Sequence, residues 1–546
     1  MSDGEVRVRA SRRHFGLAVL CLVLFLTFLD NTVVSVTLAN VQTDLHAGVT
    51  QLQWVVDAYA LVFASLMLVF GTLGDQFGRK RVMLGGVAVF CAGSVLAALA
   101  PNVTVLIAAR AIMGLGAAAS EPGTLSMIRH LYPEGRERAR ALGTWAAVSG
   151  LALALGPVVG GTLVGLWSWR AVFWFNLAFG AFALVAAAVI LPENADPVRQ
   201  RFDIRGLVLG AGGIAAAVFA VMAGETSGYR TWWVELLFGI GVIAIVGFVL
   251  AERHIANPIL NVGYFRRRSF AGANIVALTS YFGLFSIFFF VALYLQEVGT
   301  SSPYGTAIDF IPMAAAMIVA SIVSGRLVAR VGPRIPMILG CLMAAAGILW
   351  TEAVLTPSSG LMTLGLPLAL AGLGFGTVVV PITSTSLAAL PGSHSGMAAS
   401  MTNTSRELGA VAGVTVLGAI VNGQLTVNLL QRLTAIGIPK SFQQLVVTAV
   451  ETGGISGESK KYGKLGPAIN KIVNEVTTAA YAAFRHGLNL SLTIGGVLLV
   501  ASALAAASLV RGHRPGGVSP GSACKEPDDP DDGIDSGDVA GAVGTI

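Results

Sequence analysis

Long apolar runs separated by short polar turns dominate the hydrophobic pattern of the chain. Many runs hold about 18 or more residues with few charges, which is the length an α-helix needs to cross the hydrocarbon core of a bilayer. We therefore expect an all-α polytopic membrane protein with about fourteen transmembrane helices. They are expected at residues 15–39, 54–73, 82–100, 103–128, 140–164, 169–191, 205–223, 232–251, 270–296, 305–329, 335–355, 361–389, 395–423 and 486–510.

Composition supports this interpretation. Hydrophobic residues make up 55% of the 546 residues and charged residues only 12%, and the mean hydropathy is +0.75. Soluble domains carry about 25% charged residues, so this chain has too few charges for a water-facing surface of its size. The four cysteines have no metal-ligand spacing and form no disulfide framework. We expect neither a metal site nor a bound cofactor.

The basic residues predict the orientation in the membrane. The net charge is +6, but the positive residues lie in short turns and do not indicate a nucleic-acid partner. The turns on the N-terminal side carry Arg79, Lys80, Arg81, Arg129, Arg136, Arg138, Arg140, Arg199, Arg201, Arg205, Arg253, Arg266, Arg267, Arg268, Arg330 and Arg334. Short turns on the other side hold little beyond Arg170 and Arg230. This bias predicts that both termini lie in the cytoplasm of a cell-membrane protein.

Three segments lie outside the expected helices. Residues 1–14 are expected to be a cytoplasmic N-terminus before a retained first helix, since the apolar run that follows is too long for a signal peptide. Residues 424–485 form a long extracellular loop with amphipathic stretches, either a linker or a packed hairpin. Residues 511–546 are rich in Gly, Pro and Asp, which predicts a disordered cytoplasmic tail.

A duplicated polar segment divides the helices into two related sets. Gly71-Thr-Leu-Gly-Asp-Gln-Phe-Gly-Arg-Lys80 is matched by Gly325-Arg-Leu-Val-Ala-Arg-Val-Gly-Pro-Arg334, and each copy follows the second helix of its set. Residues 15–191 and 270–510 therefore read as two six-helix bundles, and residues 205–251 as an inserted helix pair. Parallel six-helix halves with a site between them are typical of one large class of transporters.

The first copy has features of a conformational contact. Gly71 lets helix ends approach closely, and Gly78 suits a turn with positive φ. The Asp75 carboxylate could accept hydrogen bonds from free N–H groups at a helix N-terminus. The alternative is a solvated turn, and this alternative fits the second copy, where Ala329 replaces the acid.

Ionisable residues inside apolar runs are the candidates for a transport site, because each costs about 2.5–3.5 kcal/mol at the centre of a membrane helix. Asp30, Arg110 and Glu121 lie in such runs, and Asp57 lies nearer the outer end of its helix. Arg110 and Glu121 share one helix face about 16 Å apart, too far to pair directly. Each acid also has an alternative to a role in transport. Asp30 could form a structural pair, Glu121 could make a helix-end contact, and Asp57 could be a polar group at the membrane interface.

Glycines predict one helix that packs closely or bends. Gly156, Pro157, Gly160 and Gly161 leave few side chains on one face of the expected helix at 140–164. Plain helix packing and a gating contact both explain this pattern.

Several motifs in order resemble the major facilitator superfamily. Gly71–Lys80 resembles its signature loop, Leu29–Leu38 the first-helix motif of its fourteen-helix drug:proton antiporters, and Arg110–Gly116 the fourth-helix motif. Gly156–Gly161 resembles the fifth-helix motif of exporters. Trp169, Arg170, Asn176 and the run Asn403–Gly409 also have counterparts in that family, whereas Met113, Ala39 and Ala178 depart from its usual Gln and prolines. The resemblance covers roughly residues 15–425 and the last helix.

The resemblance implies a mechanism. Two bundles would rock about a central cavity, and protons would enter as a lipophilic toxic compound or antibiotic leaves, which confers resistance without any cofactor beyond a proton gradient. It also implies a conformational latch, in which Asp75 and Arg79, with Lys80 beside them, engage the start of the helix at 395–423. Arg406 is a further candidate for that partner.

The sequence leaves two alternative functions to compare with drug export. Export of an endogenous metabolite or lipid by the same fold is the nearest alternative. A membrane enzyme or receptor is disfavoured, because the sequence has no phosphate-binding Gly-Lys-Ser/Thr loop and no His-Glu-x-x-His motif.

Overall fold

Helices account for nearly all of the computed structural model, which describes residues 3–47, 49–193, 204–253, 260–297, 303–391, 394–435, 443 and 467–511. The first half holds α1 (Asp3–Leu45), α2 (Val49–Phe77), α3 (Arg79–Ala98), α4 (Val103–Leu131), α5 (Gly135–Leu166) and α6 (Arg170–Ile190). An inserted pair follows, α7 (Ile204–Ser227) and α8 (Trp232–Glu252), and then the short 3-10 helix η1 (Val262–Arg266). The second half holds α9 (Arg268–Glu297), α10 (Pro303–Val331), α11 (Arg334–Val354), α12 (Leu361–Ala389), α13 (Ser395–Ala435) and α16 (Pro467–Leu509).

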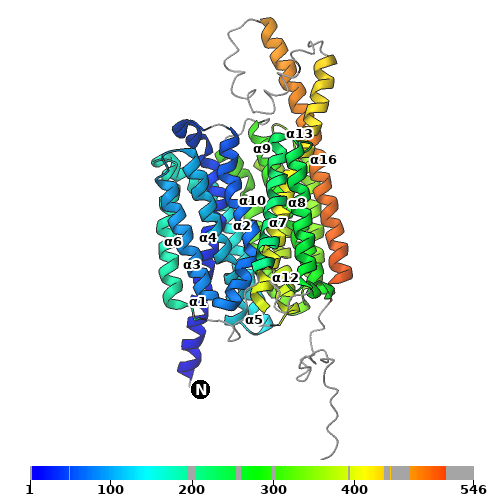
Figure 1. Cartoon of the computed structure of the whole chain (residues 1–546). Coiled ribbons are helices and arrows are strands. Elements are labelled where there is room, and N and C mark those ends of the chain that lie inside the picture. Colours follow the sequence, from blue (N-terminus) through cyan, green and yellow to red (C-terminus); the bar gives the residue numbers. More distant parts are fainter. Residues whose placement is uncertain are drawn as a thin grey trace, which may run out of the picture. The chain divides into compact units, whose positions relative to one another are not determined.

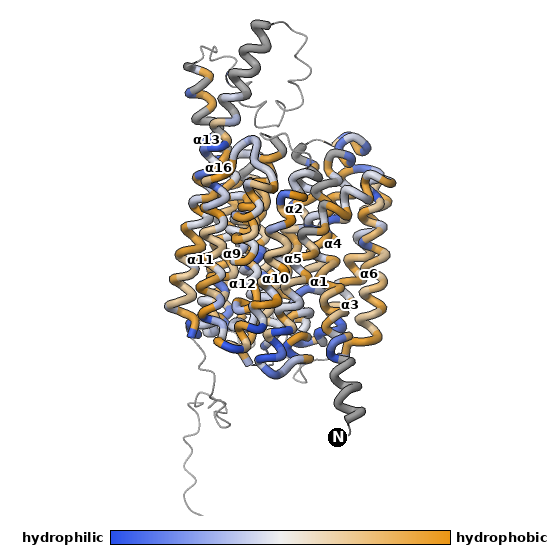
Figure 2. The backbone as a smooth tube through the Cα atoms, turned by 180° about the vertical axis from the view of Figure 1, so that it is seen from behind, coloured by the Kyte–Doolittle hydropathy of each residue, from blue (hydrophilic) through white to orange (hydrophobic). Residues whose placement is uncertain are grey.

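The helices run alongside one another, as a membrane requires. Within the described residues, twelve helices hold a stretch long and apolar enough to cross a bilayer, and α5 and α13 pack among them. A bilayer core offers no water to backbone polar groups, so a spanning segment must satisfy them within its own helix. Figure 2 shows hydrophobic positions along the helix shafts and hydrophilic positions gathered at one end. The expected all-α polytopic fold is confirmed.

Several helices are longer than the apolar runs that predict them. α1 begins at Asp3 and includes most of the expected tail at residues 1–14, and α2 continues to Phe77. The expected loop at residues 424–485 is also shorter, because α13 continues to Ala435 and α16 begins at Pro467. Polar residues extend these helices beyond the hydrophobic stretch. Residues 436–466, except Gln443, and residues 512–546 lie outside the described residues, and with them the middle of the expected loop and the expected tail.

The two halves meet along two seams. α2 packs on α13 at one seam, and α5 packs on α10 and α12 at the other. Figure 1 views the molecule from the side of α2, and Figure 2 shows α5 and α10 together from behind. The inserted α7 contacts both α2 and α13, and the rings of Trp54 and Phe219 lie 5.2 Å apart between α2 and α7. The inserted pair therefore covers the first seam.

Glycines with positive φ end the second helix of each half. Gly78 between α2 and α3 has φ 105°, and Gly332 between α10 and α11 has φ 80°. Both are the eighth residue of the duplicated segment, so the two copies share this turn. We call the end of the bundle that bears these two turns the basic end, because Arg79, Arg129 and Arg138 also lie there.

Candidate functional site

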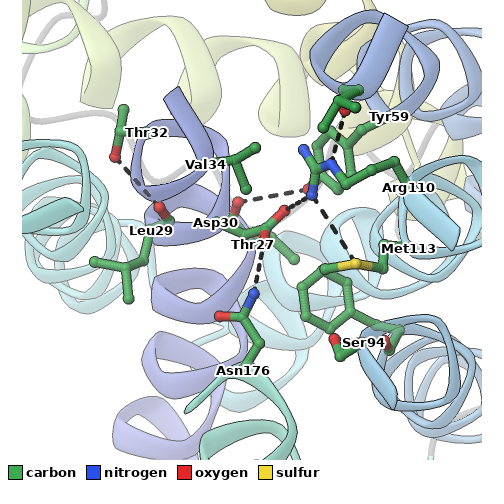
Figure 3. Close-up of polar contacts among 12 residues, drawn as sticks. Thr27, Leu29, Asp30, Thr32, Val34, Tyr59, Ser94, Arg110, Met113 and Asn176 are labelled. Atoms are coloured by element: carbon green, nitrogen blue, oxygen red, sulfur yellow. Dashed lines mark hydrogen bonds and ion pairs between the residues drawn. The ribbon is translucent and has the colours of Figure 1, made fainter. Parts of the chain in front are cut away.

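A buried ion pair joins α1 to α4 inside the first half. Arg110 Nη1 lies 2.6 Å from Asp30 Oδ2, and the two side chains are 1% and 0% exposed. The Asn176 amide of α6 donates to Asp30 Oδ1 at 2.7 Å, and Arg110 Nε donates to the Val55 carbonyl at 2.9 Å. Figure 3 shows these groups converging from four helices. Both carboxylate oxygens of Asp30 therefore have partners. This is the structural pairing that was the alternative to a transport role for this acid.

Two further side chains complete the surroundings of Arg110. Its guanidinium carbon lies 4.5 Å from the centre of the Tyr59 ring, a cation–π contact. Met113 Sδ lies 4.0 Å from Arg110 Nη1, one turn further along α4 (Figure 3). A thioether is a weak acceptor, so the methionine at this position supplies packing more than hydrogen bonding.

A second group of buried charges lies between the two halves. Glu121 of α4 is 3% exposed, and Arg406 and Glu407 of α13 are 2% and 8% exposed. The charges of Glu121 and Glu407 interact with each other and with Arg406. Arg110 and Glu121 do not pair, as their spacing on α4 predicts.

Neutral groups hold Arg406. It donates to Asn403 Oδ1 at 3.1 Å, to the Val379 carbonyl at 3.4 Å, and to the Thr383 hydroxyl. Its guanidinium carbon also lies 5.6 Å from the Trp145 ring of α5 and 5.4 Å from the Tyr281 ring of α9. Because Trp145 belongs to the first half, Arg406 contacts both halves.

Sequence reasoning missed most of this second group. Glu407 lies in the run Asn403–Gly409 but was not predicted as a site residue. It is nevertheless an acid inside an apolar helix, which is the pattern that made Glu121 a candidate. Trp145, Tyr281 and Thr383 have no comparable signal, because aromatic and hydroxyl residues are common on membrane helices. Only the packing of α4, α5, α9, α12 and α13 brings them to one place.

At the basic end, Asp75 bridges the two halves. Its carboxylate oxygens accept from the backbone N–H groups of Gly396 and Met397, both at 3.0 Å. These amides lie in the first turn of α13, where no helical carbonyl is available to them. Arg79 Nη2 holds the same carboxylate at 2.8 Å. Asp75 is 9% exposed and lies in the last turn of α2, so the alternative of a solvated turn is wrong.

Arg129 makes a matching contact at the end of the preceding helix. From the last turn of α4 it donates to the carbonyl of Leu387 and, at 3.0 Å, to that of Leu390. These carbonyls end α12 and lack helical partners. Ser126 Oγ lies 2.9 Å from Ser395 Oγ beside them. We call Asp75, Arg129 and Ser126, with the α12–α13 connection that they hold, the basic-end clamp.

Only some of the other expected latch residues lie at this clamp. A Cβ at Gly71 would lie 2.8 Å from the Gly396 carbonyl and would overlap Ser400, so α2 and α13 approach closely there. Lys80 donates to the Ala188 carbonyl at 2.7 Å, a contact within the first half. Arg406 lies about 14 Å further along α13 than Met397 and belongs to the central charges. Its expected place in the latch is wrong, because the first-turn amides of α13 already complete the Asp75 contact.

The second copy of the duplicated segment makes an equivalent contact without a charge. A Cβ at Gly325 would lie 2.5 Å from the Ala139 carbonyl and 3.2 Å from Arg140 Cα, at the start of α5. Gly71 and Gly325 therefore each bring the second helix of one half against the fifth helix of the other. Only the first copy adds an acid.

Glycines of α5 approach two neighbouring helices, α1 and α10. A Cβ at Gly160 would lie 3.0 Å from the Val33 carbonyl of α1, and one at Gly156 would overlap Thr32. Gly161 has nothing within 4 Å of such a Cβ. Close approach to the second half occurs at Gly143, where a Cβ would lie 2.8 Å from the Ser321 carbonyl of α10. Gly156 and Gly160 thus pack α5 within its own half.

Two further acids lie apart from the central charges. Asp57 is partly exposed on α2. Asp309, which is 8% exposed, accepts a backbone hydrogen bond from Leu361 at the start of α12.

At the end opposite the basic end, Asp44 ties α1 to α6. Its carboxylate accepts from Arg170 and, at 2.9 Å, from Trp169 Nε1. The Arg170 hydrogen bond, followed by that of Trp169, holds the pKa of Asp44 below its ordinary value of 3.8. Trp169 and Arg170 thereby connect the ends of two helices.

These features define a polytopic membrane transport protein, with two six-helix halves and buried charges contributed by both. Residues 20–414 match the Major Facilitator Superfamily, and the chain belongs to that family. It is 33% identical over 427 residues to "Multidrug resistance protein Stp" of Mycobacterium tuberculosis, with 78% of this chain and 79% of that protein covered. It is 30% identical over 482 residues to "Tetracenomycin C resistance and export protein" of Streptomyces glaucescens, with 87% and 88% covered.

A solved structure shares the fold. The proton:xylose symporter XylE matches with a TM-score of 0.58 and 15% identity, over 92% of this chain and 97% of that one. At this identity the match supports the helical arrangement alone.

Proposed function

We propose that this protein exports lipophilic toxic compounds or antibiotics across the cell membrane in exchange for protons, and so confers resistance. The two relatives are named for multidrug resistance and for resistance and export of tetracenomycin C. The two matches cover 78% and 87% of this chain. The proton gradient is the proposed energy source, and no cofactor takes part.

The observation that carries this proposal is the group of buried charges between the halves. Glu121 comes from the first half, and Arg406 and Glu407 come from the second. Each charge costs free energy inside a membrane, and apolar residues would pack the same helices at lower cost. Titratable groups that both halves contribute can respond to protons and to relative movement of the halves. That is what an antiporter requires.

We propose that the basic end faces the cytoplasm, together with both termini. The turns there carry most of the positive charge, and cytoplasmic loops are enriched in Lys and Arg. In this orientation the basic-end clamp closes the cytoplasmic side. Opening of that side requires Asp75 and Arg129 to release the α12–α13 connection, so these two residues act as the latch. Gly71, Gly78 and Arg79 shape and support it, whereas Lys80 bonds within the first half.

The seams are the proposed sites of movement. Gly71 against α13 and Gly325 against α5 are close contacts between halves, and these contacts separate when the basic end opens. α5 carries its own contact to α10 at Gly143 and is fixed to α1 through Gly156 and Gly160. Together with Pro157, these glycines make α5 the proposed gating helix, which moves as one body with the first half.

The test is an efflux assay on the full-length protein expressed in a sensitive bacterial host. A panel of unrelated antibiotics and dyes is compared with and without a protonophore. We expect raised tolerance and reduced accumulation for some lipophilic compounds, both abolished by the protonophore. Glu134→Gln, at an exposed position of the basic end, serves as a matched control for loss of an acid and should behave as the parent protein.

Proteoliposomes then test the coupling directly. With the interior more acidic than the medium, an antiporter should accumulate a compound identified in the panel. Uptake that ignores this gradient would contradict proton antiport. A protein that protects against no compound in the panel would favour the alternative of an endogenous metabolite or lipid as cargo.

A further inference from the structure

The buried carboxylates of the first half differ in their partners. Asp30 has an Arg110 ion pair on one oxygen and the Asn176 amide on the other. Glu121 Oε2 is buried without a hydrogen-bond partner among the described residues. A buried ionised oxygen without a partner is expensive, whereas a protonated carboxyl supplies its own donor. Glu121, and not Asp30, is therefore the acid of the first half that lacks compensation for a negative charge.

Glu407 is the buried acid of the second half whose charge acts on Glu121. α4 and α13 pack together, both side chains are at least nine-tenths buried, and their charges interact. Within the described part of the chain, no ion pair involves either glutamate. Arg406 is the cation that acts on both, and it donates hydrogen bonds to Asn403, the Val379 carbonyl and Thr383.

We propose that Glu121 and Glu407 form one proton-binding site shared by the two halves, and that this pair, not Asp30, holds the exchangeable proton. This inference rests on the proposed antiport function. Two carboxyls that share a buried site with one cation favour a single bound proton, because like charges at close range disfavour double ionisation. With one proton on the pair, Glu121, Glu407 and Arg406 together are electrically neutral.

The side chains that interact with the pair or with Arg406 support this charge count. α2 contributes Tyr59, and α9 contributes Tyr281, both neutral phenols that interact with the two glutamates. α1 and α4 contribute Asp30 and Arg110, which neutralise each other. α5 and α12 contribute Trp145 and Thr383 through their contacts with Arg406. The shared proton is therefore the charge that balances the site.

The location of the pair explains how movement would transfer the proton. Both carboxyls are buried in this conformation, in which the basic-end clamp is closed and α4 packs on α13. If α4 and α13 separate, each glutamate meets solvent without the other, and the proton passes from the carboxyl to water. Closure of the halves reunites the pair and takes up one proton. One proton is bound and one released in each cycle, so no other reactant is needed.

The test is a pH titration of the substrate-free, full-length protein by infrared difference spectroscopy, which separates protonated carboxyl groups from carboxylates. The parent protein is compared with Glu121→Gln, Glu407→Gln, the double variant and Asp30→Asn. Among the carboxyl transitions of the parent, we expect one whose midpoint moves by about one pH unit or more in each glutamate variant. It should be absent from the double variant and retained in Asp30→Asn. Glu352→Gln, which removes an acid bonded to Thr493 on α16, should also retain it.

The opposite results overturn the inference. A transition that is unchanged in both single glutamate variants, or that disappears in Asp30→Asn, would assign the proton to another group. Size-exclusion profiles check the fold of each variant. If Glu407→Gln does not fold, Glu407→Asp retains the acid at a changed distance, and an unaltered midpoint in that variant would equally contradict the pair.

Transport separates this inference from the function on which it rests. Ethidium serves as a fluorescent cationic probe in proteoliposomes with an imposed proton gradient. Gradient-driven ethidium transport by the parent that persists in the Glu121→Gln and Glu407→Gln variants would refute the pair and leave the antiport function intact. A carboxyl transition that depends on both glutamates, without any proton-driven transport, would refute the antiport function and leave the shared proton site intact.

Discussion

Arg129 Nη2 donates a hydrogen bond of 3.0 Å to the carbonyl oxygen of Leu390 across the two halves of the molecule. A positive charge thus lies at the C-terminal end of α12, while the Asp75 carboxylate lies at the N-terminal end of α13. The macrodipole of a helix favours cations at its C-terminus and anions at its N-terminus. The first half therefore holds both ends of the α12–α13 connection with charges of the favourable sign.

Loss of either charge should loosen the basic-end clamp. Each contact of this type contributes up to about 2 kcal/mol in a favourable, partly buried setting, which is up to about a thirtyfold change in a two-state equilibrium. Cysteines at Ser126 and Ser395, whose hydroxyls lie 2.9 Å apart, report closure through disulfide formation. In a background without the natural cysteines, we expect Asp75→Asn and Arg129→Gln each to slow this cross-link several-fold.

Lys80→Gln is the matched control for the loss of a charge at this end. Its amine bonds to the Ala188 carbonyl within the first half, so the cross-linking rate should be unaltered. Equal rates in the parent, Asp75→Asn and Arg129→Gln proteins would show that the two charges do not hold the clamp.

Two glycines of α2 should differ sharply when changed to alanine. A Cβ at Gly71 would overlap Ser400 of the second half, whereas one at Gly74 would meet only Arg79, at 3.9 Å. Gly71→Ala should therefore wedge α2 away from α13 and slow the Ser126–Ser395 cross-link, and Gly74→Ala should have little effect. The same slowing in both variants would indicate a general effect on α2 and not this contact.

The apolar runs were sufficient to predict the fold but not the ends of its helices. Hydropathy identifies the stretch inside the bilayer, and the helical hydrogen bonds continue beyond it wherever polar residues allow. Asp75 shows the consequence. The glycines and basic residues around Asp75 predict a turn. Asp75 nevertheless lies in α2, because the first-turn amides of α13 satisfy its carboxylate.

Individual candidate residues were predictable where one side chain is unusual in its surroundings. Asp30, Arg110 and Glu121 stand out as charges in apolar helices. Arg129 does not, because arginine is ordinary in a turn at the basic end, and its partners are backbone carbonyls of residues far away in the sequence. Contacts of this kind depend on the packing of α4 against the second half, and no local pattern encodes them.

The Asp30–Arg110 pair should show strong coupling in a double-mutant cycle. Removal of one partner leaves the other charge buried, which costs about 3–5 kcal/mol. We expect Asp30→Asn and Arg110→Gln each to lower the thermal midpoint of the purified protein, and the double variant to lose less than the sum of both. Additive losses would show that the two side chains do not depend on each other.

Alanine at two neighbouring glycines of α5 tests how this helix is fixed to α1. A Cβ at Gly160 would lie 3.0 Å from the Val33 carbonyl, and one at Gly161 would meet nothing within 4 Å. Overpacking of a close contact costs about 1–3 kcal/mol. Gly160→Ala should therefore lower the thermal midpoint, whereas Gly161→Ala should leave it unchanged. The reverse order would contradict the packing of α5 on α1.

The Asp44–Arg170 contact should stabilise the end opposite the basic end in a pH-dependent way. The Arg170 hydrogen bond holds the pKa of Asp44 below its ordinary value of 3.8, so folding favours the ionised carboxylate. Its contribution is therefore fully present above about pH 4 and is lost as the pH falls through the lowered pKa. The pair is partly exposed, so the effect should be small and weakened by salt. We expect Asp44→Asn to lower the thermal midpoint slightly at neutral pH and low salt, with the difference from the parent disappearing in acid. A difference that grows in acid would contradict this assignment.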